Sequence, residues 1–86
     1  MAPSPVVALN RAVAVGEVSG ADAALAIVEE LALDRYYLWH AIRADLLKRV
    51  GRYRDASSAF DAALARTDNA AERAFLQRGR DAVRPH

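Results

Sequence analysis

No proline interrupts the chain between Val6 and Arg84, and this gap constrains the fold more than any other feature of the 86-residue sequence. A proline inside a helix removes a hydrogen bond and clashes with the preceding turn, so its absence leaves this stretch free to be helical. The stretch is rich in Ala, Leu, Glu and Arg, which are strong helix formers. No Asn-Gly or Asp-Gly pair marks a β-hairpin. The sequence therefore predicts an all-α domain.

Local start and stop signals divide this stretch into five helices. Ser4 is a suitable N-cap for a helix whose first position is Pro5, because a missing N–H costs nothing there. Gly51 suits the left-handed position that follows a helix C-terminus. We expect helices from Pro5 to Gly16–Glu17, from a Ser19–Asp22 capping box to Leu33–Asp34, from Tyr36 to Val50, from Tyr53–Asp55 to Leu64, and from an Asn69–Glu72 capping box onward.

The first pair of helices can be superposed on the second pair with an offset of 32 residues. Arg11 then falls on Arg43, and Ala24 falls on Ala56. A helical pair repeated at this period is typical of a solenoid, and short loops make neighbouring helices antiparallel. We expect antiparallel helical hairpins in a right-handed, tetratricopeptide-like stack over residues 5–81. Residues 1–4 are then a linker remnant, and residues 82–86 form a frayed tail.

The second copy of the repeat carries the more specific motif. It reads Gly51-x-Tyr53-x-x-Ala56-x-x-x-Phe60-x-x-Ala63-Leu64, which resembles the tetratricopeptide pattern. The glycine permits the turn, the alanines let helices approach closely, and the aromatic residues fill the space between hairpins. This sequence departs from the pattern at three places: His40 occupies the usual Trp position with Trp39 beside it, Arg43 replaces a Leu, and Asp68 replaces the terminal Pro.

Three segments, Pro5–Ala14, Tyr37–Arg52 and Asn69–Leu76, resemble the C-terminal extension of a bacterial subgroup of extracytoplasmic-function (ECF) RNA polymerase sigma factors. The resemblance implies a cytoplasmic regulatory domain that binds protein. Its implied partners are the upstream sigma regions of the same chain, the RNA polymerase core or a regulator. The DNA-binding and polymerase-binding regions of such factors have no counterpart in this sequence. The alternative is a freestanding scaffold or dimerisation module unrelated to transcription.

In tetratricopeptide geometry the first helix of each pair lines a concave groove. Carried over by position, the partner-binding groove is expected at Leu9, Val13, Glu17, Ala41, Asp45, Lys48 and Arg49. A second set of residues forms a candidate polar or structural motif: Asn10, Arg11, Trp39, His40 and Arg43. Because Trp39 lies one step off the standard slot, we expect it to be partly exposed and available to a partner. The other aromatic residues are expected mostly in the core.

The two repeated arginines leave two interpretations open. Their stems can cover the core while the guanidinium groups reach a carboxylate, or the pair can recognise an anion. Candidate carboxylates are Glu29, Glu30, Asp55 and Asp61. For His40 we expect a packed, hydrogen-bonded side chain at a hairpin interface. Lys48, Arg49, Arg52 and Arg54 are expected to be a solvated basic helix end.

Composition excludes several other functions. The chain has no cysteine and only two histidines, so we expect neither a metal site nor a cofactor, and no motif places a catalytic nucleophile. The formal net charge is +1, which is too balanced for a duplex-binding face, so no direct nucleic-acid binding is expected. No apolar run reaches the ~20 residues of a membrane span. An uncovered first helix makes weak homodimerisation plausible.

Overall fold

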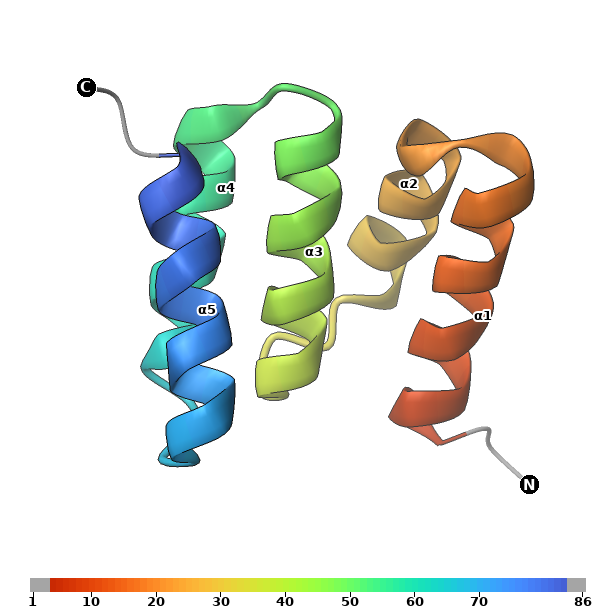
Figure 1. The fold of residues 1–86 in the computed structure, drawn as a ribbon. Coiled ribbons are helices and arrows are strands. Elements are labelled where there is room, and N and C mark those ends of the chain that lie inside the picture. The colour runs from red at the N-terminus through yellow and green to blue at the C-terminus, as the bar shows by residue number, and fades with distance from the viewer. Residues whose placement is uncertain (1–3, 84–86) are drawn as a thin grey trace.

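The structure, a computed structural model, describes residues 4–83. Within that range the chain forms five α-helices and no β-strand, as the sequence predicts. The packed helices measure 43 × 28 × 18 Å, and Figure 1 shows them side by side along the longest dimension. The helices are α1 (Pro5–Ser19), α2 (Ala21–Leu31), α3 (Tyr37–Arg49), α4 (Tyr53–Leu64) and α5 (Ala70–Val83).

The first helix begins where the sequence predicts and ends later. The Ser4 side chain accepts a hydrogen bond of 3.2 Å from the Val7 backbone N–H, which confirms the N-cap. The expected end at Gly16–Glu17 is wrong, because α1 continues through Ser19 and Gly20 is its C-cap. Gly16 lies inside the helix for a packing reason. A Cβ atom at that position would stand only 2.9 Å from the Cβ of Ala24 on α2, so the glycine permits a close helix crossing.

The boundaries of the second helix also differ from those predicted. The capping box expected at Ser19 and Asp22 is absent, because Ser19 still belongs to α1 and Gly20 caps α2 without a side-chain hydrogen bond. The helix ends at Leu31, because its C-cap Ala32 has a left-handed φ of 48°, and so it stops just before the expected Leu33–Asp34. The left-handed backbone conformation of this single alanine ends the helix. Alanine is not a residue type that predicts a left-handed conformation, so the sequence did not indicate this helix end.

The turn between α3 and α4 confirms the role predicted for Gly51. Its φ is 83°, a left-handed value that a Cβ atom disfavours. The Gly51 N–H donates to the Lys48 carbonyl at 3.1 Å, and the Arg52 N–H donates to the Leu47 carbonyl at 2.9 Å. These two bonds form a Schellman motif, which satisfies carbonyl groups that the end of α3 leaves open.

Half of the capping box expected at the last helix is present. The Asn69 side chain accepts a 2.9 Å hydrogen bond from the Glu72 N–H, whereas the Glu72 carboxylate turns away toward Thr67 and Tyr37. The helix α5 extends through Val83, whose side chain is buried, and so includes the first two residues (82 and 83) of the expected tail. The rest of the expected tail (84–86) and of the linker remnant (1–3) lies outside the described residues.

The helices pack as two hairpins and a final helix. α1 pairs with α2, α3 pairs with α4, and α5 packs on α4 (Figure 1). Among the described residues α3 is the central helix, because it contacts each of the other four. The odd-numbered helices form one layer in which α3 touches both α1 and α5, whereas α2 and α4 do not touch each other. This is the tetratricopeptide-like arrangement of antiparallel hairpins.

Equivalent positions of the two repeats form the core. Small residues sit where helices cross, and a larger apolar residue fills the space beside each crossing. The residues that the repeat matches are buried, each at most 2% exposed. The small matched pairs are Ala12 with Ala44 and Ala24 with Ala56, and the larger matched pair is Val28 with Phe60. The internal repeat read from the sequence is therefore a repeat of packing.

Candidate functional site

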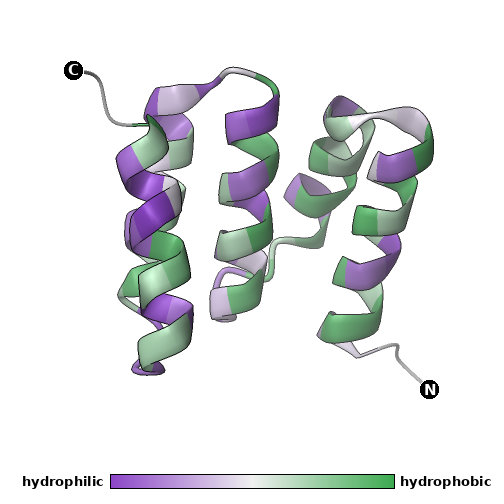
Figure 2. Ribbon diagram, in the orientation of Figure 1, coloured by the Kyte–Doolittle hydropathy of each residue, from purple (hydrophilic) through white to green (hydrophobic). Residues whose placement is uncertain are grey.

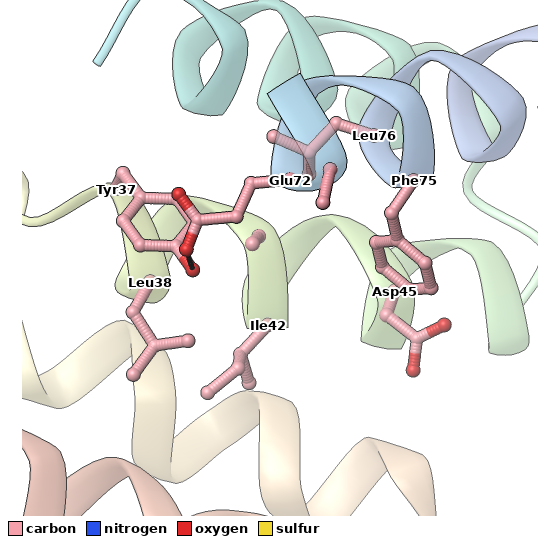
Figure 3. A pocket seen from close by; sticks show the side chains of 9 residues that line it. Tyr37, Leu38, Ile42, Asp45, Glu72, Phe75 and Leu76 are labelled. Carbon is pink, nitrogen blue, oxygen red and sulfur yellow. Dashed lines mark hydrogen bonds between the residues drawn. The ribbon is translucent and has the colours of Figure 1, made fainter. Parts of the chain in front are cut away.

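A solvent-exposed apolar groove of about 410 Å³ runs between α3 and α5 (Figure 3). On both helices its lining residues recur at spacings of one, four and five, which places them on a single helix face. The groove is lined by Tyr37, Leu38, Ala41, Ile42 and Asp45 of α3 and by Ala71, Glu72, Phe75 and Leu76 of α5. It lies in the layer of odd-numbered helices, where the concave surface was expected.

Phe75 is the most exposed large apolar side chain of this groove. It is 58% exposed and points from α5 toward Asp45 on α3 (Figure 3), whereas its neighbour Leu76 is only 1% exposed and forms part of the core. The expectation that the aromatic residues are mostly core is wrong for Phe75, and also for Tyr36 and Tyr53, which are about half exposed. A phenyl ring left in water beside a groove is a suitable contact for an apolar partner group.

A hydrogen-bonded pair closes one end of the groove. The Tyr37 hydroxyl donates to one oxygen of the Glu72 carboxylate at 2.5 Å, and the Thr67 hydroxyl donates to the other at 2.5 Å. The bonds from Thr67 and Tyr37 hold the pKa of Glu72 below its ordinary value. The bond to Glu72, together with partial burial, raises the pKa of Tyr37. At neutral pH this end therefore carries a fixed carboxylate and a neutral phenol.

Positive charge lies beyond the other end. A second hollow of about 170 Å³ shares Asp45 and Phe75 with the groove, so the two adjoin along the line where α3 and α5 meet, the α3–α5 seam. Lys48 and Arg78 line this hollow, and neither forms an ion pair with a carboxylate among residues 4–83. Asp45 itself is paired with Arg49 at 3.0 Å. The seam thus passes from an acidic end through an apolar middle to a basic end.

The structure brings together only part of the groove set predicted from the sequence. Ala41 and Asp45 line the groove, and Lys48 lines the adjoining hollow. Arg49 is exposed and touches the site only through its ion pair with Asp45. The predicted α1 members are not in the groove: Leu9 is 1% exposed and belongs to the core, while Val13 and Glu17 lie exposed on α1. The groove is displaced toward the C-terminus because α5 forms its second wall.

The residues of the polar motif that lie on α3 are structural. Trp39 is buried, and its Nε1 donates to the Val28 carbonyl at 2.8 Å, so the expected partial exposure is wrong. His40 is also buried, and its Nε2 lies 2.7 Å from the Asp34 carbonyl oxygen. Since a carbonyl only accepts, that nitrogen carries the proton. This confirms the packed, hydrogen-bonded histidine.

The two repeated arginines have different surroundings. Arg43 pairs with Glu29 of α2 at 2.8 Å, and its guanidinium lies 5.7 Å from the Trp39 ring centroid. The first interpretation, in which the stem packs while the charged group reaches a carboxylate, is confirmed at Arg43. Arg11 and its neighbour Asn10 are both exposed on α1.

The basic cluster is partly neutralised within the described residues. Arg49 pairs with Asp45, and Arg52 makes two hydrogen bonds to Asp55. Arg52 and Arg54 are exposed, as expected of a solvated helix end.

Within residues 4–83 no three metal-ligating side chains come together. No helix of that range is long and apolar enough to cross a bilayer.

Sequence reasoning missed the α5 wall of the groove. A signal was present, because Tyr37, Leu38, Ala41 and Ile42 repeat the spacing of Ala71, Glu72, Phe75 and Leu76. The offset between these two sets is 34 residues, the full length of a tetratricopeptide unit. Treating α5 as the first helix of a third unit predicts that it lines the same surface as α3.

Comparison with known proteins gives one informative relative. The chain is 51% identical over 77 residues to an uncharacterized protein of Rhizobium meliloti (strain 1021). The match covers 87% of this chain and 18% of that protein, so this chain spans less than a fifth of the relative's length. No protein-family model and no solved structure matches the chain.

Proposed function

We propose that this chain is the C-terminal protein–protein interaction domain of an ECF-type RNA polymerase sigma factor, acting in the cytoplasm. In this role it modulates transcription initiation by binding a polypeptide surface and performs no chemistry. The observation that carries the interaction role is the apolar α3–α5 groove, with Phe75 58% exposed at its edge. Exposed apolar surface of this kind is stabilised when a partner covers it.

Two further observations support the transcriptional setting. The segments Pro5–Ala14, Tyr37–Arg52 and Asn69–Leu76, which resemble the sigma-factor extension, cover α1, α3 and the first half of α5. These are the helices of the groove layer. In addition, more than four-fifths of the Rhizobium relative lies outside the matched segment, which is room enough for the upstream regions that such a factor needs.

The seam also suggests how a partner segment is oriented. Its acidic end, at Glu72, favours a cation on the partner, and its basic end, at Lys48 and Arg78, favours a carboxylate. An apolar side chain between those two charges contacts Phe75 and Ile42. Charge order therefore sets direction, and apolar burial supplies most of the affinity.

Site-specific photocrosslinking tests the proposal. A photoreactive residue is placed at Phe75 in the longer protein that contains this domain, and crosslinked peptides are identified by mass spectrometry. We expect crosslinks to the upstream sigma regions, the polymerase core or a transcription regulator. The matched control is the same residue at Tyr53, an aromatic position of α4 with similar exposure outside the groove.

Function is measured in parallel with Phe75→Ala and Tyr53→Ala. We expect transcription by the intact factor to change several-fold for the first variant only, while far-UV dichroism shows both domains folded. Equal effects of the two variants would remove the groove from the mechanism. Crosslinks from Phe75 only to proteins unrelated to transcription would favour the freestanding scaffold instead.

A further inference from the structure

The outer side of α1 is a large helix face that the described residues leave uncovered. The helix contacts α2 and α3 on its inner side, and the opposite side bears exposed valines. Figure 2 shows hydrophobic segments along this outermost helix. Val7 is 58% exposed and Val18 is 88% exposed, and Arg11 lies between them in the sequence.

The equivalent face of α3 has a known occupant within this same chain. Trp39, Arg43, Leu46 and Val50 recur at helical spacing, so they share one face. That face packs against α2, because the Trp39 Nε1 donates to the Val28 carbonyl and Arg43 pairs with Glu29 at 2.8 Å. Trp39 and Leu46 are buried there.

The offset of 32 residues maps this α2-binding face onto α1 residue by residue. Trp39 corresponds to Val7, Arg43 to Arg11, Leu46 to Ala14 and Val50 to Val18. All four residues of α1 are exposed in the structure. The first repeat therefore presents a smaller version of the binding face of the second, with the arginine kept, the tryptophan replaced by a valine and the leucine replaced by an alanine.

We infer that Val7, Arg11, Ala14 and Val18, the α1 outer face, form a docking site for an acidic amphipathic helix of the α2 type. The helix presents a carboxylate to Arg11, as Glu29 does to Arg43, and covers the valines with apolar side chains. Its source is another segment of the same polypeptide. In a solenoid, neighbouring helices come from one chain joined by short loops, and five residues (32–36) join α2 to α3 here. This inference does not depend on the proposed function.

A grafted helix tests this inference directly. Residues 20–35, which contain α2 and most of its loop, are duplicated immediately before Ser4, which then takes the place of Tyr36 and still caps α1, so that the copy meets α1 in the register in which α2 meets α3. We expect the extended chain to unfold at a higher urea concentration than the original chain. The matched control carries Glu29→Arg in the added copy, which keeps the length of the extension and most of its helix propensity.

Exchanging the charges of Arg11 and of Glu29 in the added copy distinguishes specific docking from a general effect of lengthening the chain. We expect the control extension to lower the folded-to-unfolded ratio about two- to fivefold relative to the unmodified extension, the range of a partly exposed ion pair. Combining it with Arg11→Glu should restore the ratio, while Arg11→Glu alone leaves the original 86-residue chain unchanged. An extension that adds no stability, or one whose gain ignores both charge changes, would overturn the inference.

Sedimentation of the original chain tests the source of the helix. A second copy of the chain could cover the same face, and it would do so only as the concentration rises. The sequence leaves weak homodimerisation through the first helix open, but we expect the valine face alone to be too small for it and the chain to remain monomeric. A concentration-dependent dimer that Val18→Asp abolishes would instead make a second copy the occupant and overturn the assignment to the same polypeptide.

Discussion

At the scale of single residues, Glu72 connects three separate parts of the chain. Its carboxylate accepts hydrogen bonds from Tyr37 on α3 and from Thr67 in the loop before α5, while its backbone N–H donates to Asn69. The capping-box spacing predicted only the last of these contacts. The first two depend on where α3 lies, which no local pattern specifies. One glutamate thus joins the first turn of α5 to its Asn69 cap, to the preceding loop and to α3.

These bonds predict how stability depends on pH. The folded-state pKa of Glu72 is lowered. Its contribution to the free energy of unfolding is therefore present above the ordinary pKa of 4.5 and is lost as the pH falls through the folded-state pKa. Tyr37 has a raised pKa, so its contribution is present below the ordinary value of 10.0 and is lost as the pH rises through the folded pKa. We expect Glu72→Gln to reduce the decrease in the free energy of unfolding that the original chain shows as the pH falls into the acid range, measured by urea denaturation.

The control for this prediction is Glu17→Gln, which changes an exposed carboxylate on α1. This variant should keep the decrease that the original chain shows in the acid range. Tyr37→Phe should remove the alkaline loss that the tyrosine causes. If Glu72→Gln and the original chain lost stability in parallel across the acid range, the carboxylate would not be held by these bonds.

At the scale of elements, the position of α5 depends on one close approach to α4. A Cβ atom at Gly79 would lie 2.5 Å from the Phe60 ring, which is itself only 2% exposed and cannot move into solvent. A glycine inside a helix lowers the helix propensity of the segment. Here the close packing of Phe60 leaves no room for a Cβ atom at this position.

We expect Gly79→Ala to destabilise the chain despite a gain in helix propensity of about 1 kcal/mol. Overpacking against a buried ring costs typically 1–3 kcal/mol, so the net loss in the free energy of unfolding should be about 1 kcal/mol. Urea denaturation measures it. Gln77→Ala, an exposed change in the same helix, should be neutral or slightly stabilising. In a background that carries Phe60→Leu, which makes room beside position 79, Gly79→Ala should lower the free energy of unfolding by less. If Gly79→Ala lowered it equally in both backgrounds, contact with the Phe60 ring would not be the cause.

At the scale of the whole molecule, stability should decrease from the centre of the stack toward both end helices. The central helix α3 contacts every other helix, whereas α1 and α5 each contact only two of the helices described in residues 4–83. Helices with fewer buried contacts open locally at lower free energy. We therefore expect native-state hydrogen exchange to be slowest in α3 and faster in α1 and α5. Uniform protection of all five helices would mean that the chain opens only as a unit, and would contradict this gradient.

The sequence by itself determined how many helices form and where most of them start. The absence of proline, the Ser4 cap, the turn at Gly51 and the Asn69 cap act within a few residues, so their effects can be predicted without knowing the rest of the fold. The 32-residue repeat likewise predicted which small residues lie at the helix crossings.

Only the tertiary structure decided which faces stay open. Trp39 is buried because α2 supplies a carbonyl for its indole, position 16 needs a glycine because Ala24 approaches it, and Phe75 is exposed because α3 leaves a groove beside it. Each outcome depends on a neighbour distant in sequence or on the space left between two helices. Burial is a property of the assembled stack, so local patterns predict helices and only packing selects the binding surface.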